Sequence, residues 1–234
     1  MDLFYAPDIE SVNTLPEDES LHCTRVLRKT AGSEIKITDG KGSFFDAHIT
    51  KPHPKRCEVE IDRKERWVKP WKGILHLAVA PTKNMERMEW LVEKITELGV
   101  DTITPLLCRY SERKELKPAR LEKIMVSAMK QSQKALLPIF NPLTPFSVFM
   151  EHSFQGEKLI AHCYDGEKKT LRQACVPGKV MLVLIGPEGD FSEEEVALAL
   201  KKEFTPVTLG DTRLRTETAA LLACSAFHLT GQKR

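Results

Sequence analysis

The sequence has no apolar run that approaches the roughly 18 residues needed to cross a membrane, and its 12 glycines and 14 prolines show no period, which excludes a fibrous protein. Its six cysteines form no Cys-x-x-Cys pair, and no histidine lies at zinc-ligand spacing from one. We therefore expect reduced core thiols and no metal site. Residues 1–5 lack the basic and apolar segments of an export signal, so we expect a cytoplasmic protein.

What is present is an ordinary globular composition, with 41% hydrophobic and 29% charged residues among 234. This length allows one large domain or two small ones. The 35 basic and 33 acidic residues leave a net charge of only +2, so the whole chain does not look like a nucleic-acid binder. Residues 109–134, however, hold eight basic and three acidic side chains. This local excess fits either phosphate binding or a solvated helix face.

The pattern along the chain predicts two domains joined by a short linker. Residues 1–68 are predicted to form a small β-rich barrel, with a helix near 18–27 and strands at 34–38, 43–49 and 58–61. The Pro-containing basic segment 69–72 is the predicted linker. From 73 to 234, apolar strands alternate with segments of helical period, which favours an α/β domain with a mainly parallel sheet.

Two polar loops each follow a predicted strand and precede a helix, which is where open α/β sheets bind ligands. The first, 185–192, contains glycines but neither Gly-Lys-Ser/Thr nor Gly-x-Gly-x-x-Gly, so nucleotidase and dinucleotide loops are not indicated. The second, 209–220, places Arg213 and Arg215 beside a helix start, where cations are unfavourable, and so indicates an anionic or electron-rich ligand. A plain strand–turn–helix connection and an arginine–glutamate ion pair remain open as structural alternatives.

The two loops together, Gly186-Pro187-Glu188-Gly189 and Leu209-Gly210-x-x-Arg213-Leu214-Arg215-Thr216-Glu217-Thr218-Ala219, resemble the signature of the SPOUT methyltransferases. The closest resemblance is to the family that methylates N3 of a uridine in 16S ribosomal RNA, nucleotide 1498 in the family's naming. Further matching motifs are His22 to Arg28, Lys83 to Val100, Arg109-Tyr110-Ser111 and Gln131-Ser132. The chain departs from the family pattern at Asp190, usually glycine, and at Lys134, usually arginine.

This resemblance implies a PUA-like RNA-binding β-barrel followed by an α/β-knot (SPOUT) methyltransferase domain with a C-terminal trefoil knot. It implies S-adenosyl-L-methionine as cofactor and 16S rRNA within the small ribosomal subunit as partner, with no membrane and no metal. It also implies a homodimer formed through the knot region. The terminal helix would supply either that interface or ordinary core packing, with Leu221, Leu222, Ala223, Ala226 and Phe227.

The resemblance also assigns roles to individual residues. The cofactor-binding set is Leu184, Ile185, Gly186, Pro187, Glu188, Gly189, Leu209, Gly210, Leu214, Thr216, Thr218 and Ala219. The RNA-binding set is His22, Arg25, Arg28, Arg109, Ser111, Arg113, Gln131 and Lys134, although a hydrogen bond within the barrel suits His22 equally. Arg215 would stabilise the uracil anion. Glu217 is a candidate general base, and either Thr216 or Glu217 would cap the terminal helix.

Three other functions stay open. One is methylation of another rRNA or tRNA site, such as a ribose 2′-hydroxyl. Another is a non-catalytic RNA-binding factor for ribosome assembly that keeps the fold. A small-molecule α/β enzyme fits less well, since it leaves the β-rich module and the basic 109–134 segment without a purpose.

Overall fold

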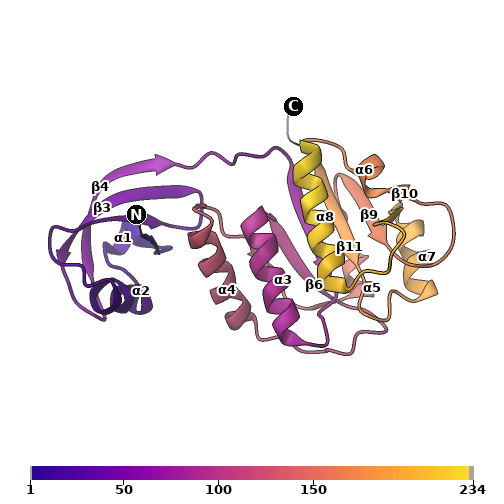
Figure 1. Cartoon of the computed structure of the whole chain (residues 1–234), viewed down its shortest axis with the longest axis horizontal. Helices are drawn as coiled ribbons and strands as arrows, with labels where there is room; N and C mark the ends of the chain where they lie inside the picture. Colours follow the sequence, from indigo (N-terminus) through magenta and orange to yellow (C-terminus); the bar gives the residue numbers. More distant parts are fainter. Residues whose placement is uncertain (1, 232–234) are drawn as a thin grey trace. The chain divides into compact units, whose positions relative to one another are not determined.

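The computed structural model describes residues 2–231, and the chain divides into two compact units (Figure 1). One unit contains residues up to Lys69 together with Val126–Leu137, and the other contains Pro70–Met125 and residues from Pro138 onward. The first unit thus takes in a segment that the sequence-based division assigns to 73–234. The domain boundaries 1–68, 69–72 and 73–234 themselves stay a prediction.

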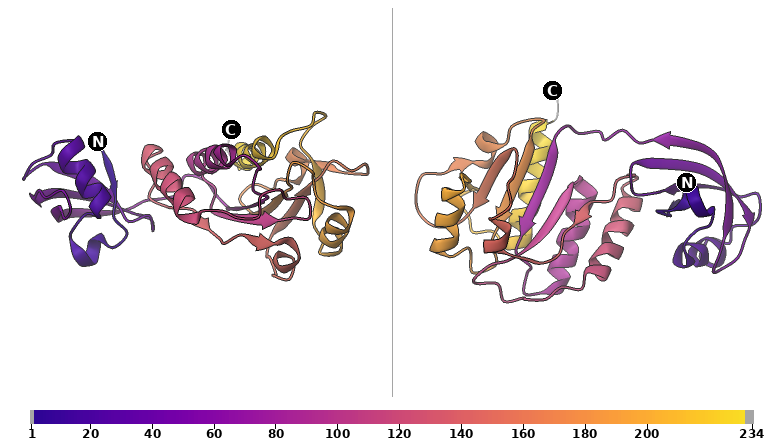
Figure 2. Two further views of the ribbon diagram at one scale, coloured as in Figure 1. Left: turned by 90° about the horizontal axis from the view of Figure 1, so that it is seen from below. Right: turned by 180° about the vertical axis from the view of Figure 1, so that it is seen from behind.

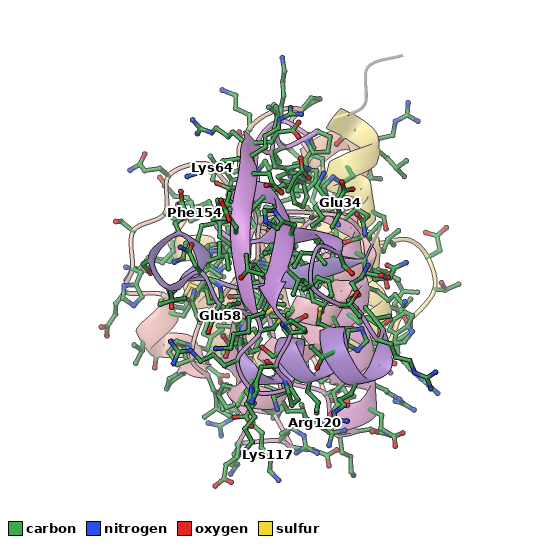
Figure 3. The ribbon with its side chains drawn as sticks, turned by 90° about the vertical axis from the view of Figure 1, so that its left-hand side faces the viewer. Glu34, Glu58, Lys64, Lys117, Arg120 and Phe154 are labelled. Atoms are coloured by element: carbon green, nitrogen blue, oxygen red, sulfur yellow. The ribbon has the colours of Figure 1, made fainter. Side chains whose placement is uncertain are left out.

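The first unit, here the N-terminal unit, is built on a four-stranded sheet in the order β1-β2-β3-β4. The strands are β1 (Leu3–Tyr5), β2 (Glu34–Thr38), β3 (Ser43–Lys51) and β4 (Glu58–Arg66). Glu58 and Lys64, labelled in Figure 3, both lie on β4. β1 pairs with β2 in parallel, whereas the other pairs are antiparallel. Buried side chains of β2 to β4, among them Ile37, Phe45 and Ile49, form the core of this unit.

Three short helices complete the N-terminal unit: α1 (Ile9–Val12), α2 (Glu17–Leu21) and the π-helix η1 (His22–Val26). The single helix predicted over 18–27 is therefore two segments, because the hydrogen bonds change from α to π spacing at His22. Strand β1 was not predicted, since three residues carry too little periodicity to be recognised.

The second unit, here the α/β unit, contains eight parallel strands in the order β10-β12-β9-β11-β5-β6-β7, with β8 paired to β6. The predicted parallel sheet is confirmed. Its strands are β5 (Ile74–Val79), β6 (Thr102–Leu107), β7 (Ile139–Phe140), β8 (Thr144–Pro145), β9 (Glu157–Ala161), β10 (Lys169–Thr170), β11 (Val180–Ile185) and β12 (Thr205–Thr208). Strand β11 is apolar throughout and β5 nearly so, because both faces of the sheet are covered.

Helices lie on both faces of this sheet (Figure 2). On one face α3 (Met85–Leu98) packs beside α8 (Thr216–Gly231), which contacts β5 and β11. On the other face lie α5 (Phe146–Phe149) and α7 (Glu193–Lys201), which bury Phe146 and Ala199 against Ala78, Leu182 and Leu184. The remaining helices are α4 (Pro118–Gln131) and α6 (Leu171–Ala174).

Local signals fix where the main helices begin and end. The Asn84 side chain accepts a hydrogen bond from Glu86 N at the start of α3, and Gly99 ends that helix with a φ of 110°. Ser192 and Glu195 form the predicted capping box of α7. Among residues 2–231, no helix combines the length and apolar character of a membrane span.

The last part of the chain crosses the sheet. β12 lies near one edge, next to β9, whereas α8 packs on β5 and β11 nearer the middle. The loop 209–215 therefore carries the chain past β9 to the carboxyl end of β11. The knot that the family resemblance implies in this region stays a prediction.

Candidate active site

The loops that follow β11 and β12 line one pocket of about 650 Å³ at the carboxyl ends of the strands, here the loop pocket. Thr216 Oγ1 donates a hydrogen bond of 3.0 Å to the carbonyl oxygen of Gly186, so the start of α8 is tied directly to the loop after β11. Two segments joined by residues 30 positions apart in the sequence thus face the same pocket, as their position after parallel strands predicted.

Most of the predicted cofactor-binding residues line this pocket. They are Ile185, Gly186, Pro187, Glu188, Leu209, Gly210, Leu214, Thr216 and Ala219. Three predicted residues are not among the lining residues. Leu184 is fully buried in the core beneath α5 and α7, Thr218 is exposed on α8, and Gly189 packs beside Tyr110. Successive residues point to opposite faces of a strand and to different sides of a helix, so Leu184 and Thr218 face away from the pocket that their neighbours line.

The pocket also has a third wall that the sequence motifs did not reveal. It comes from residues 161–168 after β9, of which Ala161, His162, Cys163 and Lys168 face the pocket. Because β9 is parallel to β11 and β12, its following loop must emerge at the same edge of the sheet. The strand order would have located this wall, but no short motif marks it.

Asp190 fastens the third wall to the loop after β11. Its Oδ2 accepts a hydrogen bond of 2.6 Å from Cys163 N, and its Oδ1 accepts one of 2.8 Å from Phe191 N. Asp190 has a φ of 65°, a left-handed conformation in which aspartate is tolerated better than most residues. The departure from the family's usual glycine therefore keeps the backbone shape and adds a cross-link between two loops.

Two further contacts hold the same wall. Tyr164 Oη donates to the carbonyl oxygen of Phe191 at 2.7 Å, and Lys168 Nζ donates to the carbonyl oxygens of His162 and Tyr164. Burial, together with the charge of Lys168, lowers the pKa of His162. The buried Nδ1 of this histidine has no hydrogen-bond partner within the described residues. The lowered pKa favours the neutral ring, whose Nδ1 is buried rather than exposed to the pocket.

The loop 209–215 presents backbone amides as well. Across residues 2–231, the N–H groups of residues 211–215 make no hydrogen bond. Gly210 adopts a φ of 126°, which only glycine accommodates readily, although a Cβ there would meet no other atom. Gly210 is therefore required by the backbone turn rather than by a close contact with another part of the chain.

The two predicted catalytic residues lie in different environments. Arg215 is exposed, lines the pocket and makes no side-chain hydrogen bond or ion pair in the described chain. Glu217 is buried, is absent from the pocket lining, and lies 3.7 Å from Arg87 Nε on α3. Its Oε2 has no hydrogen-bond partner among the described residues. Within the described residues neither Arg213 nor Arg215 pairs with Glu217 or Glu188, so that structural alternative is wrong; the cation beside Glu217 is Arg87.

The predicted helix cap is wrong. Thr216 and Glu217 are the first residues of α8 rather than residues preceding it, and Ala219 N bonds to the carbonyl oxygen of Arg215. The hydroxyl of Thr216 donates to the carbonyl oxygen of Gly186, and among the described residues it accepts no backbone N–H of the first turn of α8.

Of the RNA-binding residues predicted in the α/β unit, Arg109 is exposed, whereas the other two have internal roles. Ser111 is buried, and its Oγ accepts a hydrogen bond from Cys108 N. Arg113 donates from Nε to the carbonyl oxygen of Thr82 at 3.1 Å and from Nη2 to that of Lys83 at 2.6 Å. Glu188 Oε1 accepts from Lys83 N at 2.9 Å, so the loops after β5, β6 and β11 are joined.

The other five predicted RNA-binding residues belong to the N-terminal unit. His22, Arg25 and Arg28 are exposed on or just after η1, and Gln131 is exposed at the end of α4. Lys134 is buried, and its Nζ donates to Ser132 Oγ at 3.2 Å. A buried ammonium with an internal partner is poorly placed for a phosphate, so the structure disfavours the predicted phosphate contact of Lys134.

Fewer cations of the basic segment 109–134 are thus free to bind phosphate than its charge suggested. Arg120 pairs with Glu89 and Lys130 pairs with Glu19, each at 2.5 Å. The basic residues of this segment that remain exposed, with no ion pair in the described part of the chain, are Arg109, Lys114, Lys117 and Lys123. Lys117 and Arg120 lie at the start of α4 (Figure 3). Sequence reasoning had not singled out the three lysines.

No group of three histidine, cysteine, aspartate or glutamate side chains within residues 2–231 is arranged to hold a metal ion. The cysteines are all free, and Cys163 beside the loop pocket is the exposed one among them.

The chain matches known protein families over both units. Residues 69–228 match a family described as the RNA methyltransferase domain, and residues 15–62 match the RNA methyltransferase PUA domain. Ribosomal RNA small subunit methyltransferase E of Buchnera aphidicola is 30% identical, over 94% of this chain and 88% of that protein. The chain belongs to the RNA methyltransferase family of the small subunit methyltransferase E type.

Solved structures of this family agree over almost the full length. A probable rRNA-methyltransferase from Porphyromonas gingivalis is 45% identical, with a TM-score of 0.94 and 98% of both chains covered. Ribosomal RNA small subunit methyltransferase E from Neisseria gonorrhoeae, solved with S-adenosyl methionine, is 30% identical with a TM-score of 0.83, covering 98% of this chain and 97% of that one. The fold is therefore that of a PUA domain with a SPOUT methyltransferase domain.

Proposed function

We propose that this protein methylates N3 of one uridine in 16S rRNA of the small ribosomal subunit, nucleotide 1498 in the family's naming, with S-adenosyl-L-methionine as donor. Membership of a family whose relatives are named ribosomal RNA small subunit methyltransferase E supports this proposal. The observation that carries it is the loop pocket, where the two signature loops meet and leave an open volume of about 650 Å³.

The residues of the loop pocket fit S-adenosyl-L-methionine. Unbonded backbone N–H groups at 211–215 would hold polar edges of the donor, while Ile185, Leu209 and Leu214 supply apolar surface. The pocket volume lies within the range of about 300–1,000 Å³ that is usual for small-molecule sites. Once bound, the donor supplies a methyl group on a positively charged sulfur.

Arg215 is the residue that we assign to the acceptor base. N3 of uracil carries a proton, and loss of this proton places negative charge on the neighbouring oxygens. An arginine that lines the pocket and has no partner elsewhere can stabilise this charge without first breaking another contact. Glu217 is not in the pocket lining, so we propose that it positions α8 through Arg87 rather than accepting the proton.

We propose that RNA is captured by the exposed cations of each unit. In the N-terminal unit these are Arg25 and Arg28, with His22 beside them. In the α/β unit they are Arg109, Lys114, Lys117 and Lys123. Such contacts hold the phosphate backbone and make binding dependent on salt.

The implied homodimer also stays a proposal. The α3–α8 face of the α/β unit exposes Trp90, Leu98, Leu222 and Leu229. Ala223 and Phe227 are buried within the chain itself, which is the core-packing alternative for these two residues of the terminal helix. Sedimentation of the purified protein would test whether the exposed apolar face is covered by a second copy.

The direct test uses small ribosomal subunits from a strain that lacks this enzyme. The purified protein and isotopically labelled S-adenosyl-L-methionine are added, and the rRNA is digested to nucleosides for mass spectrometry. We expect one equivalent of labelled 3-methyluridine per subunit. Label in a 2′-O-methylated nucleoside would show a different reaction. Binding of subunits without any transfer, in a protein that also fails to bind the donor, would indicate an assembly factor instead.

A further inference from the structure

A second pocket, of about 730 Å³, lies in the α/β unit and shares no lining residue with the loop pocket. We refer to it as the strand pocket. Lys158, Leu182 and His76 occupy neighbouring register positions on β9, β11 and β5, and all three face it. They stand in the amino-terminal halves of their strands, so the strand pocket lies toward the end of the sheet opposite the loop pocket.

A chain of hydrogen bonds fixes the proton of His76. Asn141 Nδ2 donates to Thr104 Oγ1 at 2.7 Å, and Thr104 Oγ1 lies 2.7 Å from His76 Nε2. Thr104 is almost fully buried, and its hydroxyl has no other acceptor within the described residues. The single hydroxyl proton must therefore go to Nε2, because an unmet buried donor is costly. Nε2 is the acceptor, and the ring proton resides on Nδ1.

His76 is consequently a neutral hydrogen-bond donor in the wall of the strand pocket. Burial lowers its pKa to about 4, so the ring stays uncharged at neutral pH. Among residues 2–231, the Nδ1–H of His76 and the second N–H of the Asn141 amide have no acceptor. The Asn141 Oδ1 atom has no donor within the same residues. The strand pocket therefore offers both a donor and an acceptor that the protein does not use.

The rest of the lining combines aromatic side chains with exposed charged and polar residues, which are Glu151, His152, Ser153, Lys201, Lys202 and Glu203. The Phe149 ring meets the His76 ring edge-on, with centroids 5.8 Å apart, and the centroid of the Phe154 ring lies 6.2 Å from that of His76 at an interplanar angle of 57°. Lys158 Nζ donates to the carbonyl oxygen of Lys202 at 2.6 Å and lies 3.3 Å from Glu203 Oε2. Because this ammonium has its own acceptors, it is not free to bind a phosphate or carboxylate, and the wall around His76 favours a neutral group.

We propose that the strand pocket binds a neutral, planar heteroaromatic molecule of the nucleobase class. Its ring packs against Phe149 and Phe154, an acceptor atom receives the Nδ1 proton of His76, and the Asn141 amide completes the polar edge. The proposal does not depend on methyl transfer, since none of these residues lines the loop pocket. Flat rings with adjacent donors and acceptors suit such a site, because stacking and edge hydrogen bonds act together.

The test is an NMR titration of the full-length protein labelled with ¹⁵N, observing the ring nitrogens of His76. The free protein should show the Nδ1–H tautomer. Uracil should shift both ring nitrogens, whereas toluene, a flat ring without a polar edge, should not move the Nδ1–H signal. A short oligouridylate tests whether a base carried on RNA reaches the pocket as free uracil does.

Variants separate this site from any other uracil site. Phe154→Ala should weaken uracil binding by about tenfold or more, while Trp90→Ala, which removes an exposed aromatic ring on α3, should not. His76→Phe keeps a ring but lacks the donor, and it should abolish the preference for uracil over toluene. If Phe154→Ala does not fold, His76→Phe still tests the proposal.

Several outcomes would overturn the proposal. They are an Nε2–H tautomer at His76, uracil affinity unchanged in Phe154→Ala, or displacement of uracil by saturating S-adenosyl-L-methionine. Equal shifts of His76 with toluene and uracil would show a merely apolar cavity. Failure of the methylation assay would leave all of these measurements valid, so the two proposals can fail separately.

Discussion

The loop pocket and the strand pocket lie toward opposite ends of the same parallel strands, and they differ in the chemical groups that line them. The loop pocket is formed by three loops and offers unbonded backbone amides and the free guanidinium of Arg215. The strand pocket includes residues of the strands themselves, and the ring of His76 and the amide of Asn141 offer it unused donors. The loop pocket is suited to a charged ligand, whereas the wall of the strand pocket around His76 is suited to a neutral one.

The largest expected effect concerns the loop pocket and its charged residue Arg215. Arg215→Ala should lower the single-turnover rate of methyl transfer by roughly 10²–10³-fold, because a donor to a developing negative charge is lost. Affinity for S-adenosyl-L-methionine, measured by calorimetry, should change little. Arg172→Ala, an exposed arginine on α6, is the matched control. An unchanged rate in Arg215→Ala at saturating substrates would remove the assigned role.

The pH dependence of stability tests whether His76 in the strand pocket is neutral. The pKa of His76 is about 4 in the folded protein and about 6.5 when unfolded, so the unfolded state binds more protons as the pH falls below 6.5. Stability should therefore be lost between pH 6.5 and 4, by about 2–3 kcal/mol from this group. Urea unfolding at a series of pH values measures it.

The reference for this pH series is His76→Phe, which lacks the titrating ring. Carboxylates elsewhere titrate in both proteins, so only the difference between the two curves reports His76. Parallel curves would mean that His76 is not held neutral, and the contrast between the two pockets would disappear.

A smaller effect tests the link that closes the loop pocket. Thr216→Val leaves the carbonyl oxygen of Gly186 without its donor, at a cost of about 1–3 kcal/mol. We expect affinity for S-adenosyl-L-methionine to fall by roughly tenfold. A tenfold change corresponds to about 1.4 kcal/mol, which lies in the lower part of that energy range. Thr218→Val should have almost no effect, since Thr218 does not line the pocket. An equal loss of affinity in both variants would contradict the geometry of the loop pocket. It would favour the cofactor-binding set predicted from the sequence, which contains both threonines.

The smallest effect concerns RNA capture. Replacing Lys114 and Lys117 with glutamine should weaken RNA binding several-fold and reduce the slope of log K against log salt by about 0.7 for each lost phosphate contact. Lys134→Gln should leave that slope unchanged, because Lys134 is buried. The measurement is a filter-binding series over salt concentration, and a slope that changes only in Lys134→Gln would reverse the assignment.

Sequence reasoning succeeded where a signal was local. The motif around Gly186 and the motif around Arg215 each lie within a dozen residues, and each follows an apolar strand. The rule that parallel strands present their following loops at one edge then placed both motifs in the same pocket. The capping box at Ser192 and Glu195 was equally readable, since its two residues are three apart.

Sequence reasoning failed where a role depends on a distant partner. Arg113 and Arg109 look alike in the sequence, but the loop after β5 occupies the guanidinium of Arg113. Lys134 looks like a phosphate ligand until its burial in the N-terminal unit is seen. Asp190 looks like a defect in the family pattern, whereas its carboxylate ties the wall after β9 to the loop after β11.

The amino-acid sequence by itself determined the parallel α/β unit, the β-rich first unit and the two loops of the loop pocket, because period, turns and short motifs act over a few residues. Only the tertiary structure decided which cations stay free, which threonine holds the loop, and that His76, Thr104 and Asn141 form one hydrogen-bonded chain. Those three residues are separated by 28 and 37 positions, and only strand pairing and packing bring them into contact.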